Sequence, residues 1–243
     1  NCLCTKIMFF GYLLLILPFL KKIKQNSMKN KLYLFVFLLQ VLALSVHAAR
    51  VDTVFVKSPS MNREVKVVYI LPDKAVAGNP QACPVIYLLH GYGGNARTWI
   101  GVKPELPRIA DEKGVIFACP DGKNSWYWDS PRNSAYRYET FISSELVKYT
   151  DEHYATIPKK SARAISGLSM GGHGALWNAI RHSDIFGAAG SMSGGVDIRP
   201  FPDNWEMKKQ LGELAANEAV WDSTYWNNSI DYHILFFCKF FSR

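Results

Sequence analysis

The chain has 243 residues, 49% of them hydrophobic and 20% charged, with a formal net charge of +8. This length suits one α/β domain with a sizeable buried core. The positive charge is concentrated at the start: residues 1–50 contain seven Lys or Arg and no acid, whereas the remainder has 21 basic and 20 acidic residues. A basic folded surface is therefore not expected, and the composition gives no support to a nucleic-acid partner.

Residues 28–49 have the pattern of a secretory signal peptide. A short basic region begins at Met28, an apolar stretch follows over residues 32–46, and small residues at Ala48 and Ala49 provide a cleavage site. We expect a secreted or periplasmic protein with no stable membrane anchor after cleavage. A retained transmembrane anchor is the alternative, although the apolar stretch is short for a membrane span.

Residues 1–27 contain a second apolar run ahead of the predicted start at Met28, and the sequence begins with Asn1. We interpret this segment as translated upstream sequence of doubtful significance. A tandem anchor is the alternative.

Strands and helices alternate along residues 50–243, which we interpret as one domain. The first two strands read as an antiparallel hairpin, and crossover helices join the later ones. This order predicts a doubly wound α/β architecture: a mostly parallel sheet with an N-terminal antiparallel hairpin. The predicted strands are 51–57, 64–71, 84–89, 115–119, 162–165 and 186–192, and the predicted helices are 106–112, 138–154 and 170–181.

A glycine-rich turn, His-Gly-Tyr-Gly-Gly at residues 90–94, follows the apolar strand 84–89. Such a turn lets the backbone approach a ligand closely, at the carboxyl end of the strand, where α/β sheets bind ligands. We expect the Tyr92 N–H to be one donor of an oxyanion hole. His90 is predicted to be a buried residue that braces the turn.

The most informative motif is Gly-Leu-Ser-Met-Gly-Gly at residues 167–172, between a predicted strand and a predicted helix. A serine at a sharp strand-to-helix turn is lifted clear of neighbouring backbone, and flanking glycines remove the β-carbons that would collide. Ser169 is therefore the predicted nucleophile, and the Met170 N–H is the predicted second oxyanion donor. A phosphate-binding turn is the alternative, but no Gly-Lys-Ser/Thr sequence follows.

Three aromatic residues stand in the polar loop 120–131. Trp126 and Trp128 are predicted either to offer stacking surface to a sugar or phenolic ring of the substrate, or to pack a lid without touching it. His173 lies on the helix that carries the nucleophile, so we expect it to pack beneath the turn, because the base must approach Ser169 from another loop. No cysteine pair has metal-ligand spacing, and neither a metal nor a cofactor is expected.

The motifs at 90–94, 125–131, 138–141 and 167–176 together resemble the "Putative esterase" family over residues 51–230. This family holds S-formylglutathione hydrolases (esterase D), feruloyl and acetyl-xylan esterases, and mycolyltransferases of the antigen 85 type. The resemblance implies an α/β-hydrolase fold and a Ser–Asp–His triad. It also implies that Tyr92 and Met170 supply the oxyanion hole.

The C-terminal part departs from the family. The triad order is Ser, then acid, then His, and the resemblance places that His further on than the 74 residues that follow Ser169. We therefore expect a chain incomplete at its C-terminus, without the last strand, the last helix, the acid and the base, and hence with little turnover. The alternative is that His233 is the base, with Asp197 or Asp231 as the acid.

The expected function is a secreted serine esterase that forms an acyl-enzyme on Ser169, with a small-molecule or polysaccharide ester, carrying acetyl or feruloyl groups, as its substrate. Alternatives within the same chemistry are an acyltransferase and an S-formylglutathione hydrolase-like thioesterase. An alternative of another class is a non-catalytic carbohydrate-binding remnant that uses Trp126 and Trp128.

Overall fold

The computed structural model describes residues 35, 49–76, 78–130 and 133–195. The chain divides into two compact units, Asn1–His47 and Ala48–Arg243. Only Phe35 of the first unit is described, so the predictions for residues 1–27 and for the signal peptide lie almost wholly outside the described residues. None of the helices in the described ranges combines the length and the apolar character that a membrane crossing needs.

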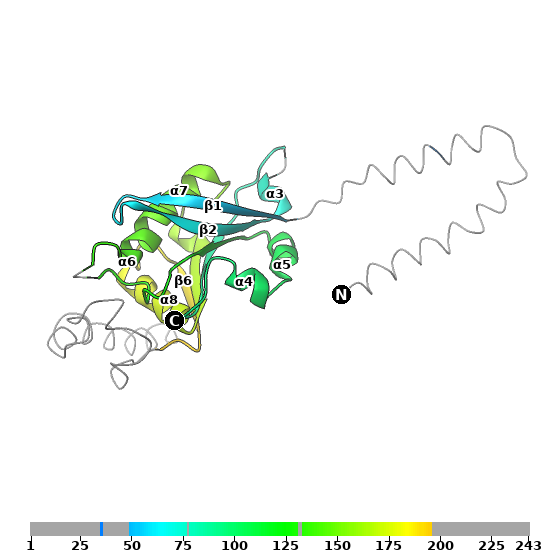
Figure 1. The fold of residues 1–243 in the computed structure, drawn as a ribbon. Coiled ribbons are helices and arrows are strands. Elements are labelled where there is room, and N and C mark those ends of the chain that lie inside the picture. The colour runs from blue at the N-terminus through cyan, green and yellow to red at the C-terminus, as the bar shows by residue number, and fades with distance from the viewer. Residues whose placement is uncertain (1–34, 36–48, 77, 131–132, 196–243) are drawn as a thin grey trace, which may run out of the picture. The chain divides into compact units, whose positions relative to one another are not determined.

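One mixed sheet organises the described part of the second unit (Figure 1). Its strands, in the order β1-β2-β4-β3-β5-β6, are β1 Arg50–Ser58, β2 Arg63–Leu71, β4 Ile116–Pro120, β3 Val85–Leu89, β5 Arg163–Leu168 and β6 Ala188–Met192. β1 pairs antiparallel with β2 and β2 with β4, whereas β4, β3, β5 and β6 are parallel neighbours. The predicted parallel sheet with an N-terminal hairpin is confirmed. The predicted lack of a last strand and helix concerns residues that are not described.

Helices cover both faces of this sheet. They are α3 Asp73–Val76, α4 Thr98–Val102, α5 Leu106–Lys113, α6 Tyr138–Thr140, the π-helix η1 Phe141–Glu145, α7 Leu146–His153, the 3-10 helix η2 Lys160–Ala162 and α8 Met170–Arg181. Tyr69 and Tyr87 belong to the core beneath α6, α7 and α8, while their neighbours Ile70 and Leu88 belong to the core beneath α4 and α5. Successive side chains of a strand point to opposite faces, so the central strands are apolar throughout because both faces are buried.

The predicted helix over residues 138–154 is present, but a π-helical turn interrupts it. At the end of this turn the Glu145 carboxylate accepts hydrogen bonds from the Ser58 hydroxyl at 2.5 Å and the Ser60 N–H at 2.8 Å. Both donors lie at the tip of the β1–β2 hairpin, so Glu145 ties the helix to that tip. The helical period of the sequence does not reveal such a turn.

A buried carboxylate joins α6 to the end of α8. Glu139 is 6% exposed and accepts hydrogen bonds from the Trp177 indole at 2.8 Å, the Arg181 guanidinium at 2.7 Å and the His182 ring at 2.9 Å. Burial alone would raise the pKa of this carboxyl, but the hydrogen bonds from His182, Arg181 and Trp177 outweigh burial and lower it.

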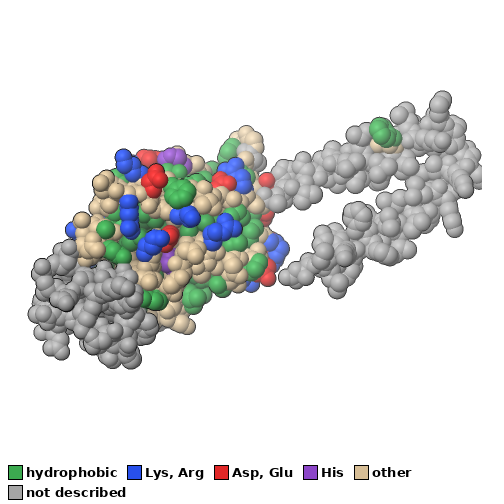
Figure 2. Space-filling view, viewed as in Figure 1, with side chains coloured by type: hydrophobic (Ala, Val, Ile, Leu, Met, Phe, Trp, Pro, Cys, Tyr) green, Lys and Arg blue, Asp and Glu red, His purple; other side chains and the backbone are tan. Residues whose placement is uncertain are grey.

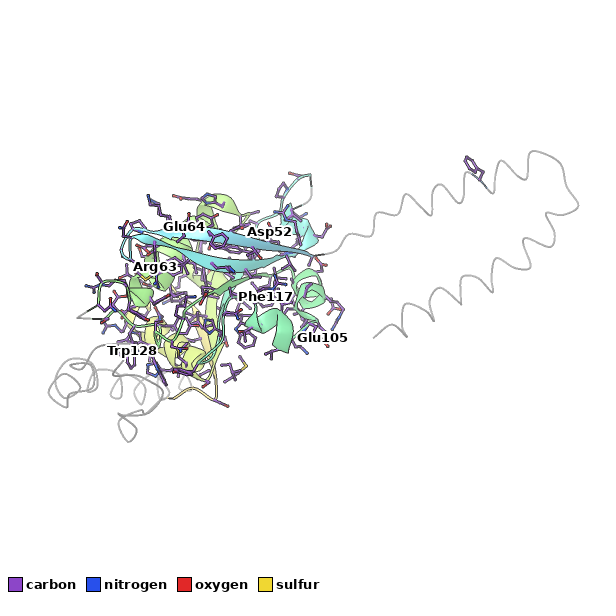
Figure 3. All side chains as sticks on the ribbon, in the orientation of Figure 1. Asp52, Arg63, Glu64, Glu105, Phe117 and Trp128 are labelled. Atoms are coloured by element: carbon purple, nitrogen blue, oxygen red, sulfur yellow. The ribbon has the colours of Figure 1, made fainter. Side chains whose placement is uncertain are left out.

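The exposed side chains of the second unit carry both signs of charge. In the face shown in Figure 2, Lys and Arg side chains are interspersed with Asp and Glu. Figure 3 shows one such neighbouring pair, Arg63 and Glu64, on β2. This mixture agrees with the near balance of acids and bases after residue 50.

Because the pKa of Glu139 is lowered on folding, its stabilising effect is complete above the unfolded value of about 4.3 and is lost as the pH falls through the lower folded value. We expect Glu139→Gln to reduce the free energy of unfolding by about 2 kcal/mol at pH 7, since it removes charged hydrogen bonds. The difference from the parent chain should shrink below about pH 4. Urea unfolding at pH 7 and pH 3 measures both values.

Glu64→Gln is the matched control, because Glu64 is exposed on β2. It should change stability by less than about 0.5 kcal/mol at either pH. A Glu139→Gln deficit that stays constant between pH 7 and pH 3 would show that charge at position 139 is not the cause.

Candidate active site

Ser169 stands at the sharp turn between β5 and α8. Its backbone has φ 55° and ψ −118°, and its side chain is exposed. The Ser169 N–H donates to the Met192 carbonyl at 2.8 Å, and its own carbonyl accepts from the His173 N–H at 3.0 Å. A positive φ is uncommon outside glycine and costs on the order of 1–3 kcal/mol, so the surrounding structure holds this serine in a strained conformation.

The glycines on either side of Ser169 permit this turn. A β-carbon on Gly167 would lie 2.3 Å from the Gly171 carbonyl carbon, and one on Gly171 would lie 2.2 Å from the Leu89 carbonyl oxygen. Strand β5, the first turn of α8 and the end of β3 therefore approach one another through bare backbone. The predicted reason for these glycines is confirmed.

The glycine-rich turn after β3 lies against Ser169. A β-carbon on Gly91 would lie 3.5 Å from Ser169 Cβ and 3.2 Å from the Leu168 carbonyl oxygen. The sheet register produces this contact, because Leu89 pairs with Gly167 and both strands end at the same edge. The structure thus brings the two sequence motifs together. The oxyanion roles of the Tyr92 and Met170 amides stay predictions.

His90 braces the turn from inside, as predicted. It is 1% exposed, and its Nε2 accepts a hydrogen bond from the Gly122 N–H at 2.9 Å. Since Nε2 accepts, the proton of the neutral ring is on Nδ1, which donates to the Gly91 carbonyl at 2.7 Å. Both ring nitrogens are thereby engaged, and His90 is not free to take a proton from Ser169.

Residues 121–130, which we call the aromatic loop, support this turn from the side of β4. Tyr127 is fully buried, and its hydroxyl donates to the His90 carbonyl at 3.0 Å. Its ring fills the space beside two glycines, since a β-carbon on Gly122 or Gly174 would lie 2.2 Å or 2.4 Å from the ring. Tyr127, Trp126 and Lys123 all have positive φ, so the loop is held in a strained form by these contacts.

The two tryptophans proposed to meet substrate are buried in this structure. Trp126 is 4% exposed and Trp128 is 6% exposed. The Trp128 indole N–H donates to His173 Nε2 at 2.8 Å, and the Trp126 ring lies edge-on to His173 at 5.4 Å between centroids. Figure 3 labels Trp128 on the side of the unit where α8 lies. These contacts give both rings a packing role, and stacking on a substrate stays a prediction.

His173 packs beneath the turn, as predicted. It is 2% exposed, accepts from Trp128 through Nε2, and through Nδ1 donates to the Gly195 carbonyl at 2.6 Å. With both nitrogens used, this histidine is not the base for Ser169. The alternative triad residues His233, Asp197 and Asp231 lie outside the described residues.

Asp121 is an ionised group close to His90. Its carboxylate accepts from the Lys123 N–H at 3.0 Å and from the Lys123 ammonium at 2.9 Å, and lies 3.7 Å from His90 Nε2. Burial by itself would raise the pKa of Asp121, but the hydrogen bonds from Lys123 and its positive charge offset this and hold the pKa well below its usual range. The group is therefore charged at neutral pH.

Sequence reasoning missed one residue at this site. Asn124 accepts a hydrogen bond from the Gly93 N–H at 2.8 Å through its side-chain oxygen. No motif marks it, because a polar residue in a loop is ordinary, and its contact depends on how the aromatic loop folds.

Within the described ranges, no group of His, Cys, Asp and Glu side chains is arranged to hold a metal ion.

Solved structures share this fold. Staphylococcus aureus fluorophosphonate-binding serine hydrolase F superposes with a TM-score of 0.65 at 21% identity, over 77% of this chain and 74% of that one. A ferulic acid esterase superposes with a TM-score of 0.57 at 27% identity, over 74% of each chain. The sheet order and the serine turn thus define an α/β-hydrolase fold.

The model of the "Putative esterase" family matches residues 58–232. The chain belongs to this family. An acetyl esterase of Caldicellulosiruptor saccharolyticus is 33% identical over 101 residues, which cover 42% of this chain and 37% of that protein. This chain therefore aligns with well under half the length of that relative.

The close approach of Gly171 to the Leu89 backbone predicts that a side chain at position 171 destabilises the fold. Gly171→Ala places a methyl group against the Leu89 carbonyl and should lower the free energy of unfolding by about 3 kcal/mol. The melting temperature should fall by about 10 °C for a domain of this size. Differential scanning calorimetry measures the change.

Gly101→Ala is the control, because a β-carbon there meets no atom within 4 Å. It should leave stability unchanged or raise it by up to about 1 kcal/mol. Equal melting temperatures for the two alanine variants would mean that the backbones at Gly171 and Leu89 are further apart in solution.

Proposed function

We propose that the chain is a secreted serine esterase that forms an acyl-enzyme on Ser169. One observation carries the proposal: an exposed serine with positive φ, in contact with a glycine-rich turn at the carboxyl ends of parallel strands. A hydroxyl in this position approaches an ester carbonyl without obstruction from its own backbone. Tyr92 lies in the middle of the glycine-rich turn, and Met170 is the first residue of α8.

In the reaction, the Ser169 oxygen forms a bond to the carbonyl carbon as its proton passes to a base. The negative charge that develops on the carbonyl oxygen is stabilised by the Tyr92 and Met170 N–H groups. The bond to the alcohol breaks, and the alcohol leaves with a proton. Water then attacks the acyl-enzyme in the same way and releases the acid.

The histidines described near Ser169 are not free to act as its base. His90 and His173 have both ring nitrogens engaged. His182 binds Glu139 at the far end of α8, and His153 binds the Tyr149 carbonyl on α7. His233, which the sequence offered as the alternative base, is the natural first candidate to test.

Acetyl or feruloyl esters of carbohydrate are the substrates we propose. The similarity to an acetyl esterase and to a ferulic acid esterase supports this class, and so does the predicted signal peptide, since an exported enzyme meets extracellular esters.

A fluorophosphonate probe tests the nucleophile. The sequence predicts little turnover if the base is missing, so labelling at Ser169 and hydrolysis of p-nitrophenyl acetate by the parent chain would show that a base is present after all. Ser169→Ala should abolish labelling and lower hydrolysis by at least about 1000-fold, because the attacking oxygen is removed. Intact-mass spectrometry and an absorbance assay provide the two measurements.

Ser183→Ala is the matched control, since Ser183 is exposed just after α8, at the opposite end of this helix from Ser169. It should be labelled and active like the parent. His233→Ala tests the base: a loss as large as that of Ser169→Ala identifies it. Binding of xylo-oligosaccharide without any labelling would instead favour a carbohydrate-binding protein.

Export has its own test. Expression with residues 28–49 intact in a bacterial host should yield a periplasmic or secreted product whose first residue follows Ala48 or Ala49. Leu38→Arg places a charge in the apolar stretch and should leave the product uncleaved in the cytoplasm. A mature chain that still contained residues 13–20 would contradict both the signal peptide and the lack of a role for residues 1–27.

A further inference from the structure

The turn proposed to bind the oxyanion is built largely of glycine. Residues 91, 93 and 94 are glycines, and Gly93 has φ 74°. Glycine allows close approach of the backbone, but it also leaves neighbouring peptide groups freer to rotate than any other residue does. An oxyanion donor has to be aimed before the charge develops, so such a turn requires an external brace.

Two peptide groups of the turn are held by hydrogen bonds. On one side of Tyr92, the Gly91 carbonyl accepts from His90 Nδ1 at 2.7 Å and from the Gly94 N–H at 3.0 Å. On the other side, the Gly93 N–H donates to the Asn124 side-chain oxygen at 2.8 Å. Because peptide groups are planar and trans, the first contact sets the direction of the Tyr92 N–H, opposite to the Gly91 carbonyl.

Asn124 is itself held in place by its own loop. The preceding residue, Lys123, has φ 50°, and its N–H and ammonium both bind the Asp121 carboxylate. The Ser125 N–H on the other side donates to the Gly122 carbonyl at 3.3 Å. The carboxamide oxygen therefore reaches Gly93 from a fixed backbone, across 31 positions of sequence.

We propose that Asn124 is a positioning residue for ester hydrolysis. By fixing the Tyr92–Gly93 peptide it prevents rotation about Tyr92, and so keeps the Tyr92 N–H aimed at the carbonyl oxygen under attack. Asn124 acts through the backbone and does not touch the reacting atoms. This role rests on the proposed function, since it requires Tyr92 to be an oxyanion donor.

Asn124→Ala tests the role. It should lower kcat for p-nitrophenyl acetate by about tenfold and leave KM within about twofold, because the oxyanion forms only after substrate binds. Affinity for a trifluoromethyl ketone, whose adduct with Ser169 carries an oxyanion, should fall by the same factor as kcat/KM. A residue that served only to stabilise the fold would change neither kcat/KM nor the affinity for the trifluoromethyl ketone.

Amide hydrogen exchange at Gly93 tests the contact without any need for turnover. Exchange should be at least about tenfold faster in Asn124→Ala than in the parent, since the hydrogen bond that protects this N–H is gone. Asn124→Asp keeps an acceptor oxygen in the same place and should restore the protection.

Asn95→Ala is the matched control. The Asn95 side chain makes the same kind of bond, to the Arg97 N–H at 2.8 Å, one residue beyond the turn. The Asn95→Ala variant should leave kcat and the rate of amide exchange at Gly93 unchanged. The proposal is overturned by unchanged exchange in Asn124→Ala, by faster exchange with full kcat, or by an equal loss of kcat in Asn95→Ala.

Labelling of the parent chain and the kcat of Asn124→Ala together distinguish a failure of the positioning role from a failure of the proposed esterase function. If the parent chain is not labelled at Ser169, the proposed function fails, and the positioning role fails with it even where Gly93 exchange responds. If the parent is labelled and Asn124→Ala keeps full kcat, the positioning role alone fails.

Discussion

The candidate site depends on one close approach of backbone. Three segments, the end of β3, the end of β5 and the first turn of α8, meet where Gly167 and Gly171 leave no side chain between them. This contact forces the chain to reverse within one residue, which places Ser169 at positive φ. The strain at the serine is thus sustained by the packing of the two strands and the helix, and the register between Leu89 and Gly167 sets which residue occupies the turn.

A second set of contacts supports the glycine-rich turn beside Ser169. His90, Tyr127 and Asn124 all bind the glycine-rich turn, yet two of them come from the aromatic loop, more than thirty residues further along the chain. The loop in turn rests on α8 through the Tyr127 ring beside Gly174 and the Trp128 indole on His173. The nucleophile and the adjacent turn therefore share one buried support.

Much of this arrangement was predictable from local patterns. The strands are short apolar or alternating runs, and the serine motif between a strand and a helix predicts its own geometry. The burial of His90 and His173 also followed from their places next to the two turns.

What the sequence did not predict arises from contacts between residues that are far apart in the chain. The π-helical turn ends at Glu145, which binds the hairpin tip, and the hydrogen bond between Gly93 and Asn124 depends on how the aromatic loop folds. Neither leaves a periodic or compositional signal. The short helix α4 was also missed, because five residues that include Thr, Ile, Val and Gly have little helical propensity.

The histidine beneath the serine turn sits among three indoles. Trp126, Trp128 and Trp177 surround His173, with ring centroids 5.4, 5.1 and 6.1 Å from it. Fluorescence from these rings therefore originates beside the histidine that packs beneath the serine turn. An excited indole is sensitive to solvent and to a neighbouring imidazole, so the emission of these three among the seven tryptophans of the chain depends on whether the packing around His173 is intact, with no dye attached.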